Sequence, residues 1–429
     1  MKTLHLTNAW HAASGGISTF YRALLDAAER RRQPMRLIVP GERNDCEDAG
    51  SFGRIYYVAA KPAPVNSTYR MIWPQQYLGP FSRIRSILLE ERPDLVEICD
   101  KYSFPYLGHL LRIGWLRDRG FHPAVAALSC ERMDENVRAY ISPAAWVRRL
   151  TQVYLKWIYF PCADHHIAVS RYTAEELRAA SRGHKIRRGV WLGPMGVDAE
   201  TFSPARRSDQ ARHHLLDLSK ATSGAKLLLY SGRLVPEKNL DLLFDTLQEL
   251  GDLDYRLLIA GDGSLRSAFG DQANRRFPGR VVFAGHLPNR AALADLYANA
   301  DVFVHPNPRE PFGIAPLEAM ASGLPLVAPN SGGIVTYAND ENAWLTAPTG
   351  PAFAAAIRSA LTDSAERTRK LAGARARAEE FEWEKITDYF LDLYAALQAG
   401  AADESALFYS TPGDYFGREL NRPIQQATD

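Results

Sequence analysis

Two glutamates with seven residues between them stand out in the stretch HPNPREPFGIAPLEAMASGLPLVA, residues 305–328. Glu310 lies in a proline-rich loop, and we expect a helix to begin near Ala315 with Glu318 in its first turn. A glycine-containing loop followed by a helix N-terminus presents N–H groups to a phosphate or to sugar hydroxyls. An acid in a first turn is also stabilised by the helix dipole, so a structural role for Glu318 is an alternative.

Two cations stand at the expected end of another strand, in LLLYSGRLVPEKNLDLL. Arg233 directly follows Gly232, and Lys238 lies at the start of the next expected helix. Arginine offers a planar fork and lysine a mobile point charge, so the pair suits a diphosphate. Solvated surface cations are the ordinary alternative. The carboxyl end of a strand is where ligands bind in open α/β sheets, and this position favours the phosphate site.

Glycine turns follow other expected strands. Gly15 and Gly16 let backbone amides approach an anion closely, but the G-x-G-x-x-G pattern is absent and a dinucleotide is not favoured. In AGHLPN, backbone groups around Gly285, His286 and Leu287 could read the edge of a nucleotide base. Ordinary turn chemistry explains both turns equally well.

The elements that would position these residues follow a regular order. Short apolar runs alternate with segments of helical period, which is the pattern of βα units around a mostly parallel sheet. Each half therefore predicts a doubly wound α/β domain, with ligands at a cleft between the carboxyl ends of the two sheets. The expected strands are residues 3–7, 36–40, 55–59, 95–99, 125–128 and 166–169, then 227–232, 256–260, 281–284, 302–305 and 325–328.

Length and turn composition predict the domain boundaries. A chain of 429 residues suits two domains. The segment GPMGVDAETFSP, residues 193–204, mixes turn formers without helical period and is the predicted linker. We assign residues 1–192 to the first domain and 205–382 to the second. We expect a helix after residue 382 to return to the first domain, with residues 383–429.

Composition indicates a globular protein of the cytoplasm. The chain is 46% apolar and 23% charged, and no apolar run is long enough to span a bilayer. The N-terminus lacks the apolar core of a secretory signal. The four cysteines are far apart in sequence and form no Cys-x-x-Cys pair, which favours a reducing compartment and argues against a thiolate zinc site.

Charge is distributed unevenly along the chain. Residues 1–190 contain 28 Lys and Arg against 18 Asp and Glu, a net charge of +10, and the remainder carries −8. A basic half suggests an anionic partner, and an arginine-rich host composition is the alternative. No nucleic-acid-binding motif accompanies the charge, so we expect no nucleic-acid partner.

Together these motifs resemble the retaining glycosyltransferases of family four, which have the GT-B fold. The glycine pair, the two cations and the E-x7-E spacing carry the resemblance. It extends through GVDAETFSP, YSGRLVPEKNLDLL, ADVFVHPNPREPFGIAPLEAMASGLPLVA and FEWEKI, and more thinly through GGIS, RPDLVEICDKYSFPYLG and AVSRYTAEEL. It implies two Rossmann-like domains facing across a cleft, and transfer of a hexose from a nucleotide diphosphate sugar with retention of configuration. A sugar-nucleotide epimerase of the same fold and a nucleotide-sugar-binding protein without turnover are the alternatives.

The resemblance also implies residue roles. Arg233 and Lys238 would neutralise the donor diphosphate, Glu310 would bind the donor sugar, and Glu318 would accept hydrogen bonds from the ribose. In such enzymes the leaving phosphate helps to deprotonate the acceptor in a front-side displacement, so catalysis is mostly positioning and charge stabilisation. The remaining implied donor-binding residues are Gly15, Gly16, Gly232, Gly285, His286, Leu287, Phe312, Gly313 and Ile314.

One position departs from the family pattern. Many members carry a histidine at the end of a central first-domain strand, where AVAALS here leads into SCERMDEN and places Cys130. A cysteine cannot reproduce the charged donor of imidazole. Either Glu131 or Arg132 takes part, or the local chemistry differs, and a buried structural role is the ordinary account of Cys130 itself.

No cofactor or metal is expected. Asp252 and Asp254 match the D-x-D pattern of metal-dependent transferases, but they precede a strand and so lie at the wrong edge of the sheet. On the acceptor side the segment AWVRRLTQVYLKWIYF, residues 145–160, mixes aromatic and basic side chains. It suits a membrane interface, and a core-packing helix with basic flanks is the alternative. The predicted acceptor is a small molecule, a glycan or an anionic lipid, with peripheral contact on the inner face of the membrane.

Overall fold

The computed structural model describes residues 1–10, 15–63, 70–116, 120–182, 190–362 and 364–400. The chain divides into two compact units. Unit 1 consists of Met1–Met195 together with the chain from Trp383 onward, and unit 2 is Gly196–Glu382. None of the helices in the described ranges is long and apolar enough to cross a bilayer.

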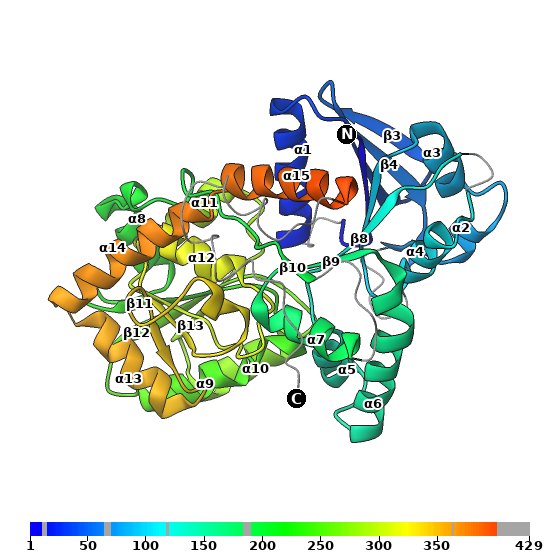
Figure 1. Cartoon of the computed structure of the whole chain (residues 1–429). Helices are drawn as coiled ribbons and strands as arrows, with labels where there is room; N and C mark the ends of the chain where they lie inside the picture. Colours follow the sequence, from blue (N-terminus) through cyan, green and yellow to red (C-terminus); the bar gives the residue numbers. More distant parts are fainter. Residues whose placement is uncertain (11–14, 64–69, 117–119, 183–189, 363, 401–429) are drawn as a thin grey trace. The chain divides into compact units, whose positions relative to one another are not determined.

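Unit 1 is built on an eight-stranded sheet in the order β10-β9-β8-β7-β1-β2-β4-β3 (Figure 1). All neighbouring strands are parallel except the β3–β4 pair at one edge. The strands are β1 (Thr3–Thr7), β2 (Met35–Gly41), β3 (Asp45–Ala49), β4 (Gly53–Ala59), β7 (Leu95–Cys99), β8 (Ala124–Ser129), β9 (His165–Ala168) and β10 (Val190–Leu192), with a separate ribbon of β5 (Lys61–Pro62) and β6 (Arg70–Met71).

The helices of unit 1 include one from the far end of the sequence. On α15, Phe390 packs against Phe20 of α1 with ring centroids 4.8 Å apart, and Tyr394 donates a hydrogen bond to the buried Glu97 of β7. Residues separated by almost 300 positions thus share one core. The helices are α1 (Gly16–Arg30), α2 (Gln75–Leu78), α3 (Arg83–Glu91), α4 (Pro105–Arg112), α5 (Met133–Tyr140), α6 (Ala145–Tyr154), α7 (Arg171–Ser181) and α15 (Trp383–Ala399).

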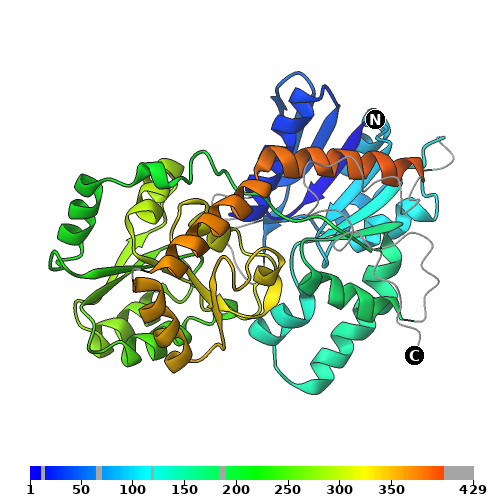
Figure 2. The same ribbon diagram turned by 60° about the vertical axis from the view of Figure 1, so that its left-hand side comes forward.

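Unit 2 has a six-stranded, wholly parallel sheet in the order β13-β12-β11-β14-β15-β16. Its strands are β11 (Lys226–Ser231), β12 (Tyr255–Ala260), β13 (Val281–Gly285), β14 (Val302–Val304), β15 (Leu326–Pro329) and β16 (Trp344–Thr346). Helices cover both faces of this sheet (Figure 2). They are α8 (Asp209–Leu218), α9 (Asp241–Glu249), α10 (Arg266–Arg276), α11 (Arg290–Asn299), α12 (Ile314–Ala321), α13 (Gly350–Leu361) and α14 (Ala365–Glu380).

The predicted fold class is confirmed, because both units are doubly wound α/β structures with mostly parallel sheets. Every expected strand is present within two residues of its predicted ends. The strands that the pattern missed include β3, β10 and β16. The first, DCEDA, is almost entirely exposed and has no apolar run, and the other two have three residues each. Short or exposed strands bury too little to leave a periodic signal.

Candidate functional site

The strand order of unit 2 reverses between β11 and β14, which are hydrogen-bonded neighbours at the centre of the sheet. Loops that leave two such strands diverge to opposite faces, and the gap between their carboxyl ends is the usual ligand site of an open α/β sheet. Arg233 and Lys238 follow β11, and Glu310 follows β14. The topology therefore brings the loops that carry the predicted cations and the first predicted acid to this switch point.

Lys238 and Glu310 form a tight, partly buried ion pair. The Lys238 Nζ lies 3.0 Å from Oε1 and 2.8 Å from Oε2 of Glu310, and Asn307 Nδ2 donates to Oε2 at 3.0 Å. His305 Nε2 lies 3.5 Å from the same oxygen. Burial alone would raise the pKa of Glu310, but Lys238 and His305 outweigh burial and hold it well below the usual range. Glu310 is therefore a carboxylate at neutral pH.

The backbone around Lys238 explains how this pair forms. Lys238 ends a short 3-10 turn, Pro236–Lys238, and Asn239 then adopts a left-handed conformation with φ of 54°. Asn239 Nδ2 donates to the carbonyl oxygen of Pro306 at 3.0 Å. Asparagine tolerates this conformation better than most residues, so it can turn the chain and tie the β11 loop to the β14 loop at once.

A tyrosine holds the Phe-Gly turn after Glu310 in place by hydrogen bonds. The Tyr337 hydroxyl donates to the carbonyl oxygens of Gly313 at 2.6 Å and Phe312 at 3.2 Å. Gly313 has φ of 91°, and a Cβ there would lie 3.0 Å from that hydroxyl and 3.1 Å from Cγ of Glu310. Helix α12 begins at the next residue, Ile314. Its first-turn N–H groups have no acceptor within the helix and are available to an anion or to hydroxyl groups.

The expectation that Glu318 lies in the first turn of this helix is wrong. Helix α12 begins at Ile314, so Glu318 is its fifth residue, and no acid occupies the first turn. The helix-dipole account fails because that stabilisation falls off within one turn. Glu318 is instead buried, with Tyr297 donating to it at 3.3 Å and an Arg290 nitrogen 3.7 Å away. Burial raises the pKa of Glu318 to about 7, against the opposing effect of Arg290.

Arg233 does not join the Lys238–Glu310 pair. Its side chain is 58% exposed and bonds to Glu237, four residues later, at 3.0 Å. The preceding Gly232 is part of a close backbone contact. Its N–H donates to the carbonyl oxygen of Ala260, and a Cβ on Gly261 would lie 1.9 Å from the carbonyl oxygen of Gly232. The N–H of Gly261 donates in turn to Gly285 at 2.7 Å. Backbone hydrogen bonds thus connect the loops after β11, β12 and β13.

The predicted base-reading turn follows β13. Gly285 has φ of 71°, His286 is exposed, and Leu287 is half-buried. Asn289 then caps α11 by accepting from the N–H of Ala291 at 2.9 Å. Arg290 comes directly after this cap, so the turn that holds His286 and Leu287 also sets the position of the cation beside Glu318.

In unit 1, the glycine pair lies at a helix N-terminus. Gly15 has φ of 52°, a Cβ there would meet no atom within 4 Å, and α1 begins at Gly16. The carbonyl oxygen of Gly15 accepts hydrogen bonds from the Ser18 and Thr19 hydroxyls, each at 3.0 Å. The pair therefore opens a helix whose first N–H groups face no side-chain cap.

The three residues at the position of the family histidine have different surroundings. Cys130 Sγ lies 3.8 Å from Cys99 Sγ, and this contact together with burial raises the pKa of the Cys130 thiol. Arg132 forms a two-point contact with Asp134 and is held in place structurally. Glu131 accepts from Asn136 at 2.6 Å, and burial raises its pKa.

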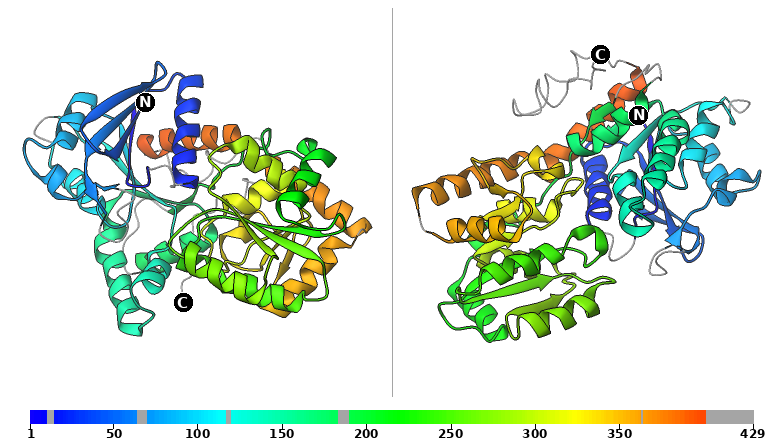
Figure 3. Two further views of the ribbon diagram at one scale, coloured as in Figure 1. Left: turned by 180° about the vertical axis from the view of Figure 1, so that it is seen from behind. Right: turned by 90° about the horizontal axis from the view of Figure 1, so that it is seen from below.

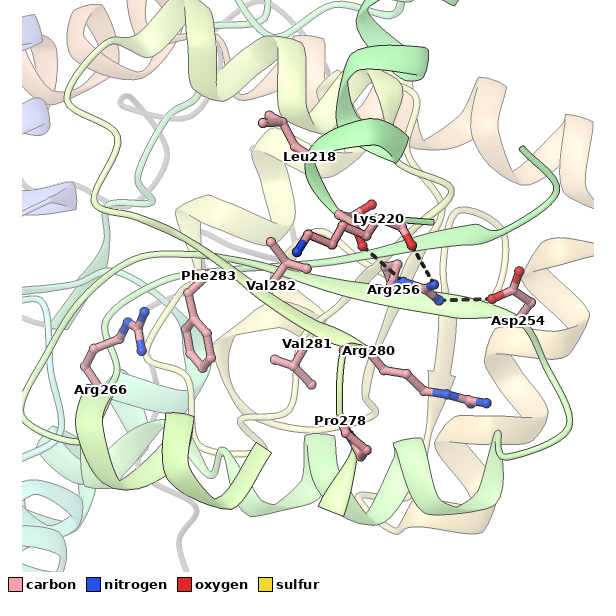
Figure 4. A pocket seen from close by; sticks show the side chains of 12 residues that line it. Leu218, Lys220, Asp254, Arg256, Arg266, Pro278, Arg280, Val281, Val282 and Phe283 are labelled. Carbon is pink, nitrogen blue, oxygen red and sulfur yellow. Dashed lines mark hydrogen bonds and ion pairs between the residues drawn. The ribbon is translucent and has the colours of Figure 1, made fainter. Parts of the chain in front are cut away.

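A cavity of about 580 Å³ lies elsewhere on unit 2 (Figure 4). It is lined by Lys220, Arg256 and Arg280, among others, and contains none of the predicted site residues. The Arg256 guanidinium is committed to Asp254 and to the carbonyl oxygens of Ser219 and Lys220. Asp254 is therefore part of an ion pair at the amino end of β12. Over the ranges that the structure describes, no three His, Cys, Asp or Glu side chains gather as metal ligands.

Comparison with known proteins gives a consistent result along the sequence. The model of Glycosyltransferase Family 4 matches residues 14–200, and the model of Glycosyl transferases group 1 matches residues 218–378. The chain is a glycosyltransferase with a Glycosyltransferase Family 4 domain followed by a Glycosyl transferases group 1 domain. It is thus a transferase that uses a nucleotide sugar, and the epimerase alternative is not favoured.

Individual relatives agree with this family. The GDP-mannose-dependent alpha-(1-6)-phosphatidylinositol dimannoside mannosyltransferase of Mycobacterium tuberculosis is 28% identical to the transferase over 403 residues, 92% of this chain and 97% of that protein. D-inositol 3-phosphate glycosyltransferase of Xylanimonas cellulosilytica is 34% identical over 244 residues, 54% of this chain and 57% of that protein. The structure of sucrose-phosphate synthase from Thermosynechococcus elongatus matches with a TM-score of 0.71 at 21% identity, over 93% of this chain and 100% of that one.

Four residues that contact the two predicted acids were not predicted from the sequence. Asn307 and His305 contact Glu310, and both lie within five residues of it, so the motif itself carried a signal. Arg290 and Tyr297 contact Glu318 from α11. Nothing in the spacing of these two residues indicates the contact, because it depends on how α11 and α12 pack.

Proposed function

We propose that the transferase moves a mannosyl group from GDP-mannose to an acceptor hydroxyl with retention of anomeric configuration, and that it requires no metal ion. The observation that carries the proposal is the Lys238–Glu310 pair at the switch point of unit 2. The full-length mycobacterial relative is named as GDP-mannose-dependent, which supports this donor. In its more general form, the proposal is that the transferase moves a hexose from a nucleotide diphosphate sugar.

Each charged group has a defined part in this reaction. Lys238 provides a positive charge for the donor diphosphate, and Arg233, exposed at the end of β11, can turn from Glu237 to the same phosphates. Glu310 is ionised and accepts hydrogen bonds from sugar hydroxyls, while Glu318 accepts them from the ribose. The bond from the sugar carbon to the leaving phosphate breaks, the bond to the acceptor oxygen forms, and the acceptor proton passes to the leaving phosphate.

The acceptor that we propose is an anionic or lipid-linked molecule bearing a phosphoinositol group. Two relatives are named for phosphatidylinositol dimannoside and for D-inositol 3-phosphate. The net charge of +10 in residues 1–190 is complementary to such a molecule. On this proposal the enzyme acts in the cytoplasm, at the inner face of the membrane.

A panel of sugar nucleotides tests the donor. GDP-mannose should raise the melting temperature and be hydrolysed slowly without acceptor, whereas UDP-glucose and UDP-N-acetylglucosamine should do neither. With inositol phosphate or phosphatidylinositol as acceptor, the NMR spectrum of the product should show the α-anomer. Stabilisation by none of these nucleotides, or a β-linked product, would contradict the proposal.

Metal removal tests the chemistry separately. Because Lys238 and Arg233 supply the charge that a divalent ion would otherwise supply, EDTA should leave the rate of transfer unchanged. A rate that collapses in EDTA and returns with Mg²⁺ or Mn²⁺ would show that these cations do not suffice.

A further inference from the structure

Helix α6 and the π-helical turn that follows it, Leu155–Tyr159, project from the rest of unit 1 (Figures 1 and 3). Four large apolar side chains on this segment are open to solvent. Trp146 is 66% exposed, Leu150 58%, Val153 49% and Trp157 60%. We call these four residues the α6 stripe. A surface helix normally carries polar residues on its solvent face, so this stripe needs an explanation.

The spacing of the stripe shows that it is one continuous surface. Its members follow one another at intervals of four, three and four residues, which places them on one side of a helix. At roughly 100° per residue they fall within about 60° of one another. They are therefore neighbours along a single ridge and not isolated apolar residues.

The stripe is separate from the face that packs on unit 1. The buried positions are Val147, Thr151, Leu155 and Tyr159, whose centre lies about 150° around the helix from the stripe. Core packing accounts for this buried face and leaves the stripe unexplained. The segment thus has two apolar faces, and the side chains of the second are largely exposed.

Cations border the stripe on its other side. Arg149 and Lys156 lie next to it on the helical wheel, Arg148 follows, and the Lys156 Nζ is 5.3 Å from the ring centre of Trp157. No Asp or Glu occurs anywhere in residues 140–160. Tryptophan beside Lys and Arg on an exposed amphipathic helix is the pattern of a segment that lies in the headgroup region of a bilayer.

We propose that the α6 stripe is the surface by which the protein docks on an anionic lipid bilayer, with Trp146 and Trp157 inserted among the headgroups and Arg149 and Lys156 on lipid phosphates. The helix lies on the membrane and does not cross it, since no described helix is long and apolar enough to span one. This docking proposal rests on the proposed function for the identity of the lipid-linked acceptor. The evidence for the docking surface itself does not depend on which sugar nucleotide is the donor.

A second copy of the chain fits this surface less well. The contact between two copies would bring the same arginines and lysine of each face together, and like charges repel. Four side chains on one short helical segment also supply less than the roughly 800 Å² per partner that a stable interface buries. A charged lipid surface satisfies both the apolar stripe and its cationic border.

Co-sedimentation of the full chain with vesicles tests the proposal. The protein should bind vesicles that contain phosphatidylglycerol, should not bind pure phosphatidylcholine, and should dissociate as salt is raised. Trp146→Ser combined with Trp157→Ser should weaken binding at least about ten-fold, because each indole contributes interfacial area. Arg149→Gln combined with Lys156→Gln should weaken it by about five-fold per charge.

Matched controls remove the same chemistry elsewhere on unit 1. Phe81, which is 96% exposed, provides the apolar control as Phe81→Ser. Arg43 and Lys61 are exposed cations and provide the charge control as Arg43→Gln with Lys61→Gln. Both controls should bind vesicles as the wild type does, and all variants should keep the wild-type melting temperature because none of the changed side chains is buried.

Three results would overturn the docking proposal. These are no binding of the wild type to anionic vesicles, full binding by the double tryptophan variant, or a wild-type dimer that this variant dissociates. Hydrolysis of GDP-mannose without vesicles is measured on the same samples. A chain that binds vesicles but hydrolyses no sugar nucleotide would contradict the proposed function alone, and a chain that hydrolyses GDP-mannose but ignores vesicles would contradict docking alone.

Discussion

Lys238 and Glu310 compensate each other's charge at the switch point of unit 2, with Nζ to carboxylate distances of 3.0 and 2.8 Å. A buried charge without a partner is strongly unfavourable, so this arrangement keeps the site stable before any donor arrives. A diphosphate would offer Lys238 a second anionic partner. On the proposed reaction, the pair thus holds a cation where negative charge would develop on the leaving group.

Lys238→Ala should therefore reduce kcat/KM for transfer by about 100- to 1,000-fold, because the leaving diphosphate loses the positive charge of the lysine that would stabilise it. Steady-state kinetics with GDP-mannose would measure this loss. Arg358→Ala is the control, since Arg358 is an exposed cation of unit 2 paired with Asp252 and lies on α13. Near wild-type turnover in Lys238→Ala would contradict the phosphate assignment.

Glu318 provides a pH-dependent prediction. Its pKa of about 7 in the folded chain exceeds the usual value, so between about pH 4.5 and 7 the folded chain keeps a proton that the unfolded chain releases. The free energy of unfolding should consequently fall as pH rises through this window, by about 3 kcal/mol for this group. Glu318→Gln lacks this dependence and should gain stability relative to the wild type between pH 5 and pH 8.

The same titration should govern nucleotide binding. A carboxylate accepts hydrogen bonds from both ribose hydroxyls, so calorimetry should show GDP affinity rising from pH 6 to pH 8 in the wild type. Glu318→Gln should bind GDP more weakly and without this rise. Glu366→Gln changes an exposed acid of unit 2 and should alter neither property. A parallel pH profile in Glu318→Gln would assign the titration to another group.

Backbone hydrogen bonds link the loops of unit 2 to one another. Hydrogen bonds run from Gly232 to Ala260 and from Gly261 to Gly285, and they join the ends of β11, β12 and β13. Gly261 has φ of 151°, and its α-carbon faces the carbonyl oxygen of Gly232 with no room for a side chain. The position of Arg233 therefore depends on the β12 loop.

Gly261→Ala should destabilise unit 2 by about 2 to 4 kcal/mol through strain and overpacking, and should also raise KM for the donor because the Arg233 loop is displaced. Chemical denaturation and donor kinetics would measure the two effects. Gly224→Ala is the matched control, because its Cβ would meet no atom within 4 Å and its φ is not positive. Wild-type stability in Gly261→Ala would contradict the close contact.

The last described helix, α15, completes the core of unit 1. Glu97, fully buried in β7, accepts hydrogen bonds from Tyr21 of α1 and Tyr394 of α15, and His5 Nδ1 of β1 lies 3.0 Å away. A buried carboxylate is tolerated only with such partners. The helix after residue 382 is thus bound by a polar network as well as by packing on Phe20.

Tyr394→Phe should lower the free energy of unfolding by about 1.5 to 3 kcal/mol, because a buried carboxylate loses one donor. Thermal and urea denaturation would measure the loss, and hydrogen exchange should locate it in α15 and β7. Tyr57→Phe also removes a hydroxyl bonded to a glutamate, Glu47, but at an exposed edge. It should cost less than about 0.5 kcal/mol, and equal losses would show that the Glu97 network adds nothing.

The local pattern of the sequence determined much of this protein. Alternating apolar runs predicted the strands of both sheets, since strand position depends mostly on nearby residues. The spacing of Glu310, Phe312 and Gly313 indicated the loop and the helix that follows. The motifs were also sufficient to indicate the family, because each encodes a loop whose geometry is local.

Only the tertiary structure decided the surroundings of these residues. Glu318 was misplaced in the first turn because the exact start of α12 depends on Gly313 held by Tyr337, which is 24 residues away. Arg290 reaches Glu318 from another helix, and Cys130 meets Cys99 from a neighbouring strand. The face of residues 145–160 that packs on unit 1 was likewise set by the fold. Long-range packing sets each of these contacts, and the periodicity of a sequence does not record it.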